Sequence, residues 1–148
     1  MFTDIVVPQG NLPEFITMAE RLGFARLIVA ADTPKIVHCT AADMRATFEN
    51  SKDAIIVVSC RLDQVACSAA VRNNSIVCFP LGEVLAGNPA NTIWNIKLCR
   101  KYKVKAAIAS FAKTPLEMRA PRDVLSLFTC LGMEPGAAKK ALGMLQNI

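Results

Sequence analysis

Residues 54–81 read AIIVVSCRLDQVACSAAVRNNSIVCFPL, and this stretch decides the fold class. Two continuous apolar runs, at 54–60 and 75–81, have the composition of strands that are buried on both faces. The residues between them, 62–72, predict a short helix that ends at Asn73-Asn74. Strand, helix and strand in this order predict a crossover unit, in which two parallel strands share a sheet and the helix covers it.

The same alternation continues in both directions from this unit. We expect the other strands at 4–7, 26–31, 35–40 and 104–110, and the other helices at 12–22, 41–50, 90–102, 121–131 and 135–146. This pattern indicates an α/β fold with a parallel sheet of about six strands covered by helices. Such a sheet suits either a TIM-barrel-like arrangement, short of the usual eight strands, or a doubly wound open sheet. We expect residues 1–148 to form a single domain.

The composition predicts a folded protein of the cell interior. Apolar residues make up 53% of the chain and charged residues 20%, and no apolar run approaches the roughly 20 residues that cross a bilayer. The opening residues 1–4 lack the basic start of a signal peptide, so we expect a cytoplasmic location and no membrane partner.

The six cysteines lie in or beside apolar segments without a CxxC pair, which predicts buried thiols. Since the chain has one histidine, we expect no metal site, and we expect no cofactor.

Positive charge gathers in the second half of the chain. Residues 1–74 hold 7 Lys/Arg and 8 Asp/Glu, a net charge of −1, whereas residues 75–148 hold 10 and 4, a net charge of +6. This asymmetry predicts a polyanionic partner for the second half. The candidate phosphate-binding cations form two groups: Lys97, Arg100, Lys101, Lys103 and Lys105 in the first, and Lys113, Arg119 and Arg122 in the second. The alternative for the first group is that it complements the dipole at the end of its helix. The second group follows the last strand, where loops of parallel sheets bind ligands.

The sequence shows no recognisable catalytic centre. His38 lies in a predicted strand without a serine or cysteine nucleophile in a recognisable turn, and we interpret it as structural. Asp4, Asp32, Asp63 and Glu83 lie near predicted strand ends, where helix caps and turns explain them better than metal-assisted hydrolysis. Glycine-rich phosphate loops are absent from the sequence. The chain itself is therefore predicted to be non-catalytic.

The last fifty residues carry the motifs of a known family. Three segments resemble the C-terminal signature of archaeal ribonuclease P protein component 3: RKYKV at 100–104, IASFAK at 108–113 and LEMRAPRD at 116–123. Three further segments, nearer the N-terminus, resemble segments of the family and occur in the same order along the chain: DIVV at 4–7, RLGF at 21–24 and FPLGEVL at 79–85. The family is related to the thirty-kilodalton subunit of the eukaryotic enzyme. The chain resembles a shortened member, with the shortening between residues 31 and 75.

The resemblance implies a TIM-like barrel related to polymerase-and-histidinol-phosphatase (PHP) barrels but without their metal site. It implies a non-catalytic subunit of the ribonucleoprotein ribonuclease P, which assists the catalytic RNA in removing 5′ leaders from precursor tRNA. The implied partners are this RNA, the precursor tRNA and a small ferredoxin-like protein subunit, and the eight cations above would bind RNA. Because the chain is short, we expect a reduced or partly open barrel, whose sheet edges a homo- or hetero-oligomeric partner would cover.

Two other functions are compatible with the residues alone. The loops after the strands could serve a small-molecule enzyme or binding protein with a phosphorylated ligand. The chain could also be a protein-binding scaffold, whose basic second half is solvated surface. The lack of a catalytic constellation counts against the first of these.

Overall fold

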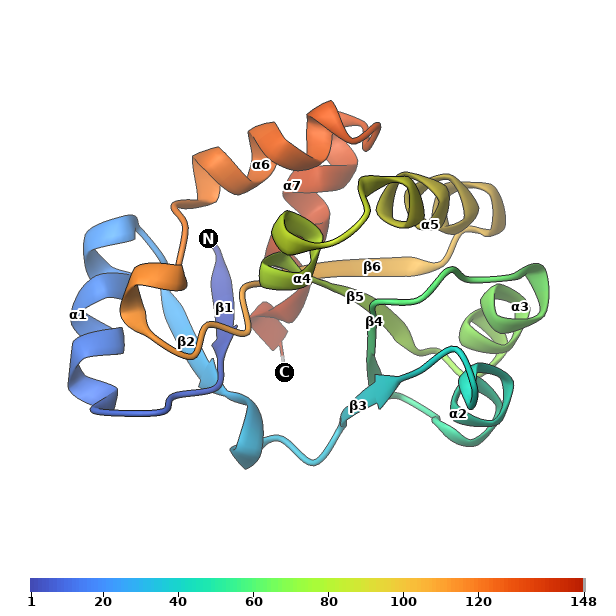
Figure 1. Cartoon of the computed structure of the whole chain (residues 1–148), viewed down its shortest axis with the longest axis horizontal. Coiled ribbons are helices and arrows are strands. Elements are labelled where there is room, and N and C mark those ends of the chain that lie inside the picture. Colours follow the sequence, from blue (N-terminus) through green and yellow to red (C-terminus); the bar gives the residue numbers. More distant parts are fainter. Residues whose placement is uncertain (148) are drawn as a thin grey trace.

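Parallel strands alternate with helices in the computed structural model, which describes residues 1–147 (Figure 1). The strands are β1 (Thr3–Val6), β2 (Arg26–Val29), β3 (Ile36–Cys39), β4 (Ile55–Val58), β5 (Ile76–Pro80) and β6 (Lys105–Ala109). The α-helices are α1 (Leu12–Leu22), α2 (Met44–Asn50), α3 (Gln64–Arg72), α4 (Leu81–Ala86), α5 (Pro89–Tyr102), α6 (Pro121–Cys130) and α7 (Pro135–Gly143). Three short 3₁₀ helices complete the order: η1 (Ala30–Asp32), η2 (Pro115–Glu117) and η3 (Met144–Asn147).

The crossover unit expected at residues 54–81 is present. All four residues of β4 are buried, and β4 pairs in parallel with β5, with Ile55 opposite Ile76. The helix between them, α3, begins after Asp63, whose side chain accepts a hydrogen bond from the N–H of Ala66 at 2.8 Å. This cap satisfies one of the free N–H groups at the start of the helix. The α/β class with parallel strands is thereby confirmed.

The strands follow one another in barrel order. Four strands pair as β3-β4-β5-β6, and β1 pairs with β2. The chain just after β6 then runs beside β1: the Phe111 N–H donates to the Ile5 carbonyl at 2.8 Å, and the Val7 N–H donates to the Ala112 carbonyl at 2.9 Å. We call this contact between β1 and residues 110–113 the seam. Across it the strand order is β2-β1-β6-β5-β4-β3, which is the consecutive order of a barrel and favours that arrangement over a doubly wound sheet.

The barrel is open between β2 and β3. Among residues 1–147, no strand pairing joins these two strands. Residues 30–35, which include η1, form the whole connection between them, without the helix that covers a usual parallel crossover. The expectation of a reduced, partly open barrel is therefore confirmed, and the opening lies within the region where the sequence resembles a shortened family member.

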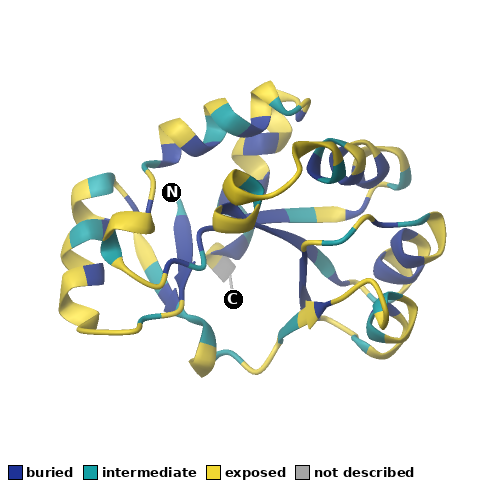
Figure 2. Cartoon of the chain, in the orientation of Figure 1, coloured by how far each residue is buried: buried dark blue, intermediate teal, exposed yellow. Residues whose placement is uncertain are grey.

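Apolar side chains fill both sides of the curved sheet (Figure 2). The inner cluster contains Ile5, Ile28, Val57 and Cys78, and Leu145 from η3 is fully buried among them. Since η3 follows α7, the end of the described chain fills the barrel interior. On the outside, the helices pack their buried faces on the sheet and leave their other faces exposed (Figure 2). Within residues 1–147, no helix has the length and apolar character to cross a bilayer.

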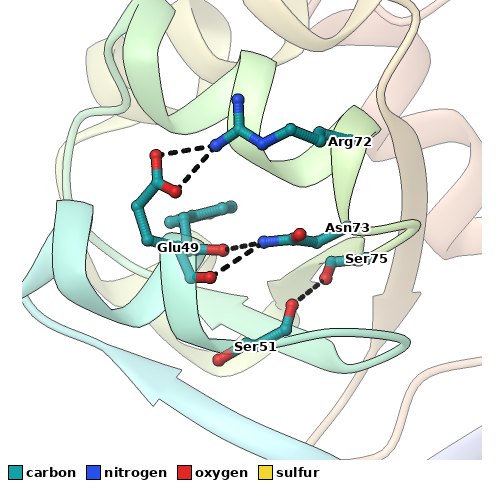
Figure 3. Close-up of polar contacts among 6 residues, drawn as sticks. Glu49, Ser51, Arg72, Asn73 and Ser75 are labelled. Carbon is teal, nitrogen blue, oxygen red and sulfur yellow. Dashed lines mark hydrogen bonds and ion pairs between the residues drawn. The ribbon is translucent and has the colours of Figure 1, made fainter.

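Polar side chains of the loop after α3 hold the end of α2 (Figure 3). The Asn73 side-chain amide donates to the carbonyl oxygens of Phe48 and Glu49 at 2.8 and 3.1 Å. Arg72 pairs with the Glu49 carboxylate, with Nη2 at 2.7 Å from Oε2. The two Asn73 bonds satisfy carbonyl groups that a helix end leaves without partners, so α2 can end after only seven residues.

The differences from the sequence predictions include one added helix and the bounds of two others. The helix α4 was not expected, because residues 79–81 continue the apolar pattern of a strand, and Pro80 instead stands at the helix N-cap. The helix expected at 41–50 begins at Met44, since the Asp43 carboxylate accepts bonds from the Thr40 N–H and hydroxyl, which hold a turn. The helix expected at 135–146 ends at Gly143 and continues as η3.

Candidate nucleic-acid interface

The two groups of cations predicted from the sequence lie at opposite ends of the barrel. Lys105 is the first residue of β6, at the amino end of the strand, whereas Lys113 follows its carboxyl end. Because an extended chain rises by about 3.3 Å per residue, the path between them is on the order of 25 Å. The two groups therefore form two separate centres of positive charge, which the sequence alone does not show.

The first group borders a hollow of about 280 Å³, which we call the basic hollow. Arg100 ends α5, Lys103 follows it, Lys105 opens β6, and all three line the hollow. Its floor is apolar and includes Val104. No Asp or Glu belongs to its lining among the described residues. A concave surface that is lined by cations and has no carboxylates has a strongly positive electrostatic potential, which attracts polyanions.

A fourth cation of the basic hollow, Lys140 of α7, was missed in the sequence analysis. Lys140 comes 35 positions after Lys105 in the chain, but α7 packs against β6 and brings the two to one hollow. The only sequence signal was the pair Lys139-Lys140 in the last predicted helix. The other two members of the first group, Lys97 and Lys101, are exposed on α5 outside the lining. The Lys101 ammonium lies 5.4 Å from the centre of the Tyr102 ring.

Lys103 has an unusual backbone conformation for a lysine. It is the C-cap residue of α5, with φ 57° and ψ 39°, in the left-handed region that glycine usually occupies at helix ends. Its N–H donates to the Arg100 carbonyl at 3.4 Å, and the next N–H, of Val104, donates to the Cys99 carbonyl at 2.9 Å. Close by, the Lys105 ammonium donates to the Asn74 side-chain oxygen at 2.7 Å.

The second group lies around the other end of the barrel. Lys113 and Arg119 line a cavity of about 580 Å³ at the carboxyl ends of the strands, which we call the mouth, while Arg122 lies in the first turn of α6 outside it. Arg119 Nη1 donates to the carbonyl oxygens of Leu116 and Met118 at 2.7 and 3.0 Å. These two bonds fix the position of the guanidinium at the rim.

His38 also lies at the mouth, where its side chain is exposed. Its ring meets the Phe111 ring edge to face, with 6.2 Å between the centres. The mouth also includes Ser110, but its hydroxyl donates to Asp4 at 2.6 Å and is not bonded to His38. The arrangement therefore has no nucleophile activated by the histidine.

The prediction that Asp4 is a helix-cap or turn residue was wrong. Asp4 lies inside β1, is 2% exposed and accepts hydrogen bonds from the N–H groups of Ile5 and Ser110 at 2.9 and 2.7 Å. Burial, opposed by the bonds from Ser110 and Ile5, raises the pKa of Asp4 to about 6. Asp4 is thus a structural element of the seam. The cap prediction is confirmed for Asp63, whereas Asp32 lies in η1 and Glu83 lies in α4 at the mouth.

The cysteines are mostly the buried thiols that were predicted. Cys39, Cys67, Cys78 and Cys99 are buried and Cys60 is half-buried. Burial is the larger of two causes that raise the pKa of Cys67 to about 11 and that of Cys99 to about 12, so both thiols remain protonated and unreactive. The prediction was wrong for Cys130, which is exposed because it lies two positions beyond the buried Phe128 of α6 and so faces outward.

Residues 1–147 hold no group of three or more His, Cys, Asp or Glu side chains that could bind a metal ion. The arrangement of side chains at both ends of the barrel instead suits the binding of phosphate groups by cations.

The chain has a relative among known proteins. No protein-family model matches the chain. The chain is similar to ribonuclease P protein component 3 of Thermococcus gammatolerans, with 28% identity in an alignment that covers 79% of this chain and 62% of the relative. The chain therefore spans less than two thirds of the relative's length. This relative carries the name of the family that the motifs at 100–104, 108–113 and 116–123 resemble.

Proposed function

We propose that this chain is a non-catalytic protein subunit of ribonuclease P of the archaeal type, and that it assists the catalytic RNA in removing 5′ leaders from precursor tRNA. The similarity to a ribonuclease P protein component supports the family assignment. In this proposal residues 1–148 act as one domain in the cytoplasm.

The basic hollow is the observation that carries this proposal. Four cations from α5, β6 and α7 line it, and its described lining has no carboxylate. Cations that neutralise phosphates release condensed counterions, which supplies affinity for any nucleic acid and makes it depend on salt. Lys103 adds weight to this interpretation, because a lysine in a left-handed conformation costs about 1 kcal/mol relative to glycine. A lysine at a position that favours glycine is consistent with a use for its charge.

The second group of cations provides a second point of contact. Lys113, Arg119 and Arg122 lie at the far end of β6 from the basic hollow. An RNA that contacts both groups must extend along this side of the barrel, past α5 and α6. We therefore assign all eight predicted cations, together with Lys140, to one elongated RNA surface with two centres.

The open side of the barrel is proposed to face a protein partner. The gap between β2 and β3 leaves strand edges unpaired among the described residues, and unpaired edges invite pairing with another chain. A small ferredoxin-like subunit, which contributes strands of its own, suits such an edge. The alternative partner is a second copy of this chain.

The RNA surface is tested by direct binding of ribonuclease P RNA at several salt concentrations. We expect the variant Arg100→Gln, Lys103→Asn, Lys105→Gln, Lys140→Gln to reduce the slope of log affinity against log salt by about 3, at up to about 0.9 per lost contact. The matched control is Arg21→Gln, Arg45→Gln, Lys52→Gln, Arg72→Gln, which removes four exposed cations from the first half of the chain. Equal losses in both variants would show that net charge alone binds the RNA.

The ribonuclease P assignment is tested by reconstitution. The chain is mixed with the catalytic RNA and the other protein subunits, and the cleavage of precursor tRNA is followed at low and moderate magnesium. We expect the chain to raise the rate, and the four-residue hollow variant to raise it less. No change in rate on adding the chain, with intact binding to the RNA, would contradict this function.

A further inference from the structure

The mouth has the chemistry of a nucleotide-binding site. Its volume of about 580 Å³ lies within the range of small-molecule sites, and it opens at the carboxyl ends of the parallel strands, where barrels bind their ligands. We propose that the mouth binds one nucleoside monophosphate group, either as a free nucleotide or as one nucleotide of an RNA strand. This inference rests on the mouth alone and does not depend on the role of the basic hollow.

Phe111 supplies a surface on which a base can stack. Its φ is 50°, in the left-handed region, which is a genuine outlier for a bulky side chain. Both neighbours of this residue are held in the seam: the Ala112 carbonyl accepts from the Val7 N–H, and the Ser110 N–H donates to Asp4. The seam thus fixes the strained backbone and places the half-buried ring in the lining of the mouth. Strain of this kind is concentrated at functional sites.

Lys113 and Arg119 supply the phosphate partners at the rim. The guanidinium of Arg119 is held by two carbonyl groups through Nη1, which leaves Nε and Nη2 as donors that can take two phosphate oxygens. Among the described residues, neither cation forms an ion pair with a carboxylate within 4.0 Å. A held guanidinium loses little freedom on binding, so its position favours a specific anion.

Two carboxylates limit the charge that the mouth accepts. Glu117 accepts a hydrogen bond from the Lys113 N–H at 2.7 Å, and Glu83 of α4 also lines the mouth. Two cations against two carboxylates suit a single phosphate and disfavour a triphosphate. A carboxylate also accepts hydrogen bonds from exocyclic amino groups and repels a carbonyl edge. Glu83 is therefore expected to favour cytosine over uracil.

Apart from His38 and Ser110, the remaining lining of the mouth is apolar and includes Val57 and Leu85. Such a wall suits a ligand that carries a base more than it suits a sugar phosphate alone. Stacking of a base on an aromatic side chain contributes appreciably and tolerates any base. The site therefore has an aromatic ring for the base to stack on, two cations for the phosphate, and the Glu83 carboxylate as an acceptor that distinguishes between bases.

The test is calorimetric titration of the purified chain with cytidine monophosphate, uridine monophosphate, cytidine triphosphate, cytidine and inorganic phosphate. We expect cytidine monophosphate to bind about tenfold more tightly than uridine monophosphate, and at least as tightly as the triphosphate. Phe111→Gly and Lys113→Ala should each weaken binding about tenfold. Glu83→Gln should remove the preference for cytosine, and Lys52→Ala, an exposed lysine of the first half of the chain outside the mouth, should change nothing.

The source of the nucleotide is decided by competition with a short cytidylate oligomer. Tighter binding of the oligomer assigns the mouth to an RNA strand, and equal binding per nucleotide assigns it to a free nucleotide; either supports the site. Thermal unfolding checks that Phe111→Gly is folded, which we expect because glycine relieves the left-handed strain. Absence of cytidine monophosphate binding at millimolar concentration, or equal binding by wild type and Phe111→Gly, would overturn the proposal. RNA binding through the basic hollow would remain intact in that case.

Discussion

Asp4 and Ser110 are separated by 106 residues in the chain, yet the Asp4 carboxylate accepts both the N–H and the hydroxyl of Ser110, at 2.7 and 2.6 Å. The pair lies in the seam, where β1 joins the end of β6. At this point the Ser110 N–H donates to a side chain, beside the main-chain bond from the Phe111 N–H to the Ile5 carbonyl.

Asp4 makes the stability of the protein depend on pH. Its pKa is raised from 3.8 to about 6 by burial, so between these values the folded state holds a proton that the unfolded chain has lost. The free energy of unfolding therefore falls as pH rises from about 4 to about 6. We expect Asp4→Asn, which keeps the acceptor oxygen but carries no charge, to lack this component. Relative to wild type, its stability should rise by on the order of 1–3 kcal/mol across this range.

Urea unfolding at a series of pH values measures this difference. Asp32→Asn, an exposed carboxylate in η1, is the control and should follow the wild-type curve. A constant difference between wild type and Asp4→Asn over the whole range would show that Asp4 titrates as an exposed carboxyl does.

Ser110→Ala should destabilise the protein by about 2 kcal/mol at neutral pH, because it removes a hydrogen bond to a buried ionised carboxylate. The Ala112 N–H, which donates to the Ser110 hydroxyl at 3.2 Å, also loses its acceptor. The loss should shrink at about pH 5, where Asp4 is largely protonated. Chemical denaturation at both pH values gives the comparison. Ser126→Ala removes an exposed hydroxyl of α6 and should have little effect.

Lys103→Gly should raise stability and lower RNA affinity together. Glycine adopts a φ of 57° without the cost that a lysine meets there, and we expect a gain of about 0.5–1 kcal/mol after allowing for the greater freedom of unfolded glycine. The lost charge should weaken binding of ribonuclease P RNA severalfold at moderate salt. Thermal unfolding and filter binding measure the two effects. Lys103→Asn, which also tolerates this conformation, should lose affinity to the same extent, and a loss of stability in Lys103→Gly would contradict the argument.

Asn73 should contribute more to stability than the ion pair beside it (Figure 3). Asn73→Ala leaves two carbonyl groups at the end of α2 without their donor and should cost about 1–2 kcal/mol. Glu49→Gln breaks the ion pair with Arg72. Because the side chains of Glu49 and Arg72 are 49% and 59% exposed, this change should lower the free energy of unfolding by less than about 0.5 kcal/mol. Urea titrations of the two variants rank the contacts, and a larger effect for Glu49→Gln would reverse our interpretation.

The elements could be predicted from the sequence because their signals are local. An apolar run such as 54–60 marks a strand, and the glycine after Leu22 marks a helix end, each to within a few residues. The short strand β3 also lies where it was expected. The helix α4 could not be predicted in the same way, since Pro80 ends an apolar strand and begins a helix at once.

The sites could be predicted only in part, because their residues meet through tertiary packing. The cations of residues 97–105 are visible as a cluster in the sequence, but Lys140 joins them only because α7 packs on β6. In the same way, an aspartate near the start of a strand looks like a turn residue until its partner Ser110 is placed beside it. The left-handed backbone of Phe111 and Lys103 leaves no mark in composition or spacing.

The seam also has a consequence for the order of folding. The strands β3 to β6 lie next to one another in both chain and space, so each can pair as soon as its neighbour has formed. The unit β1-α1-β2 must instead wait for residues 110–113, because the seam is its strand contact with the rest of the sheet. Contacts between residues so distant in the chain slow folding. During synthesis on the ribosome, the first unit therefore stays undocked until most of the chain has emerged, and the closing of the seam completes the native barrel.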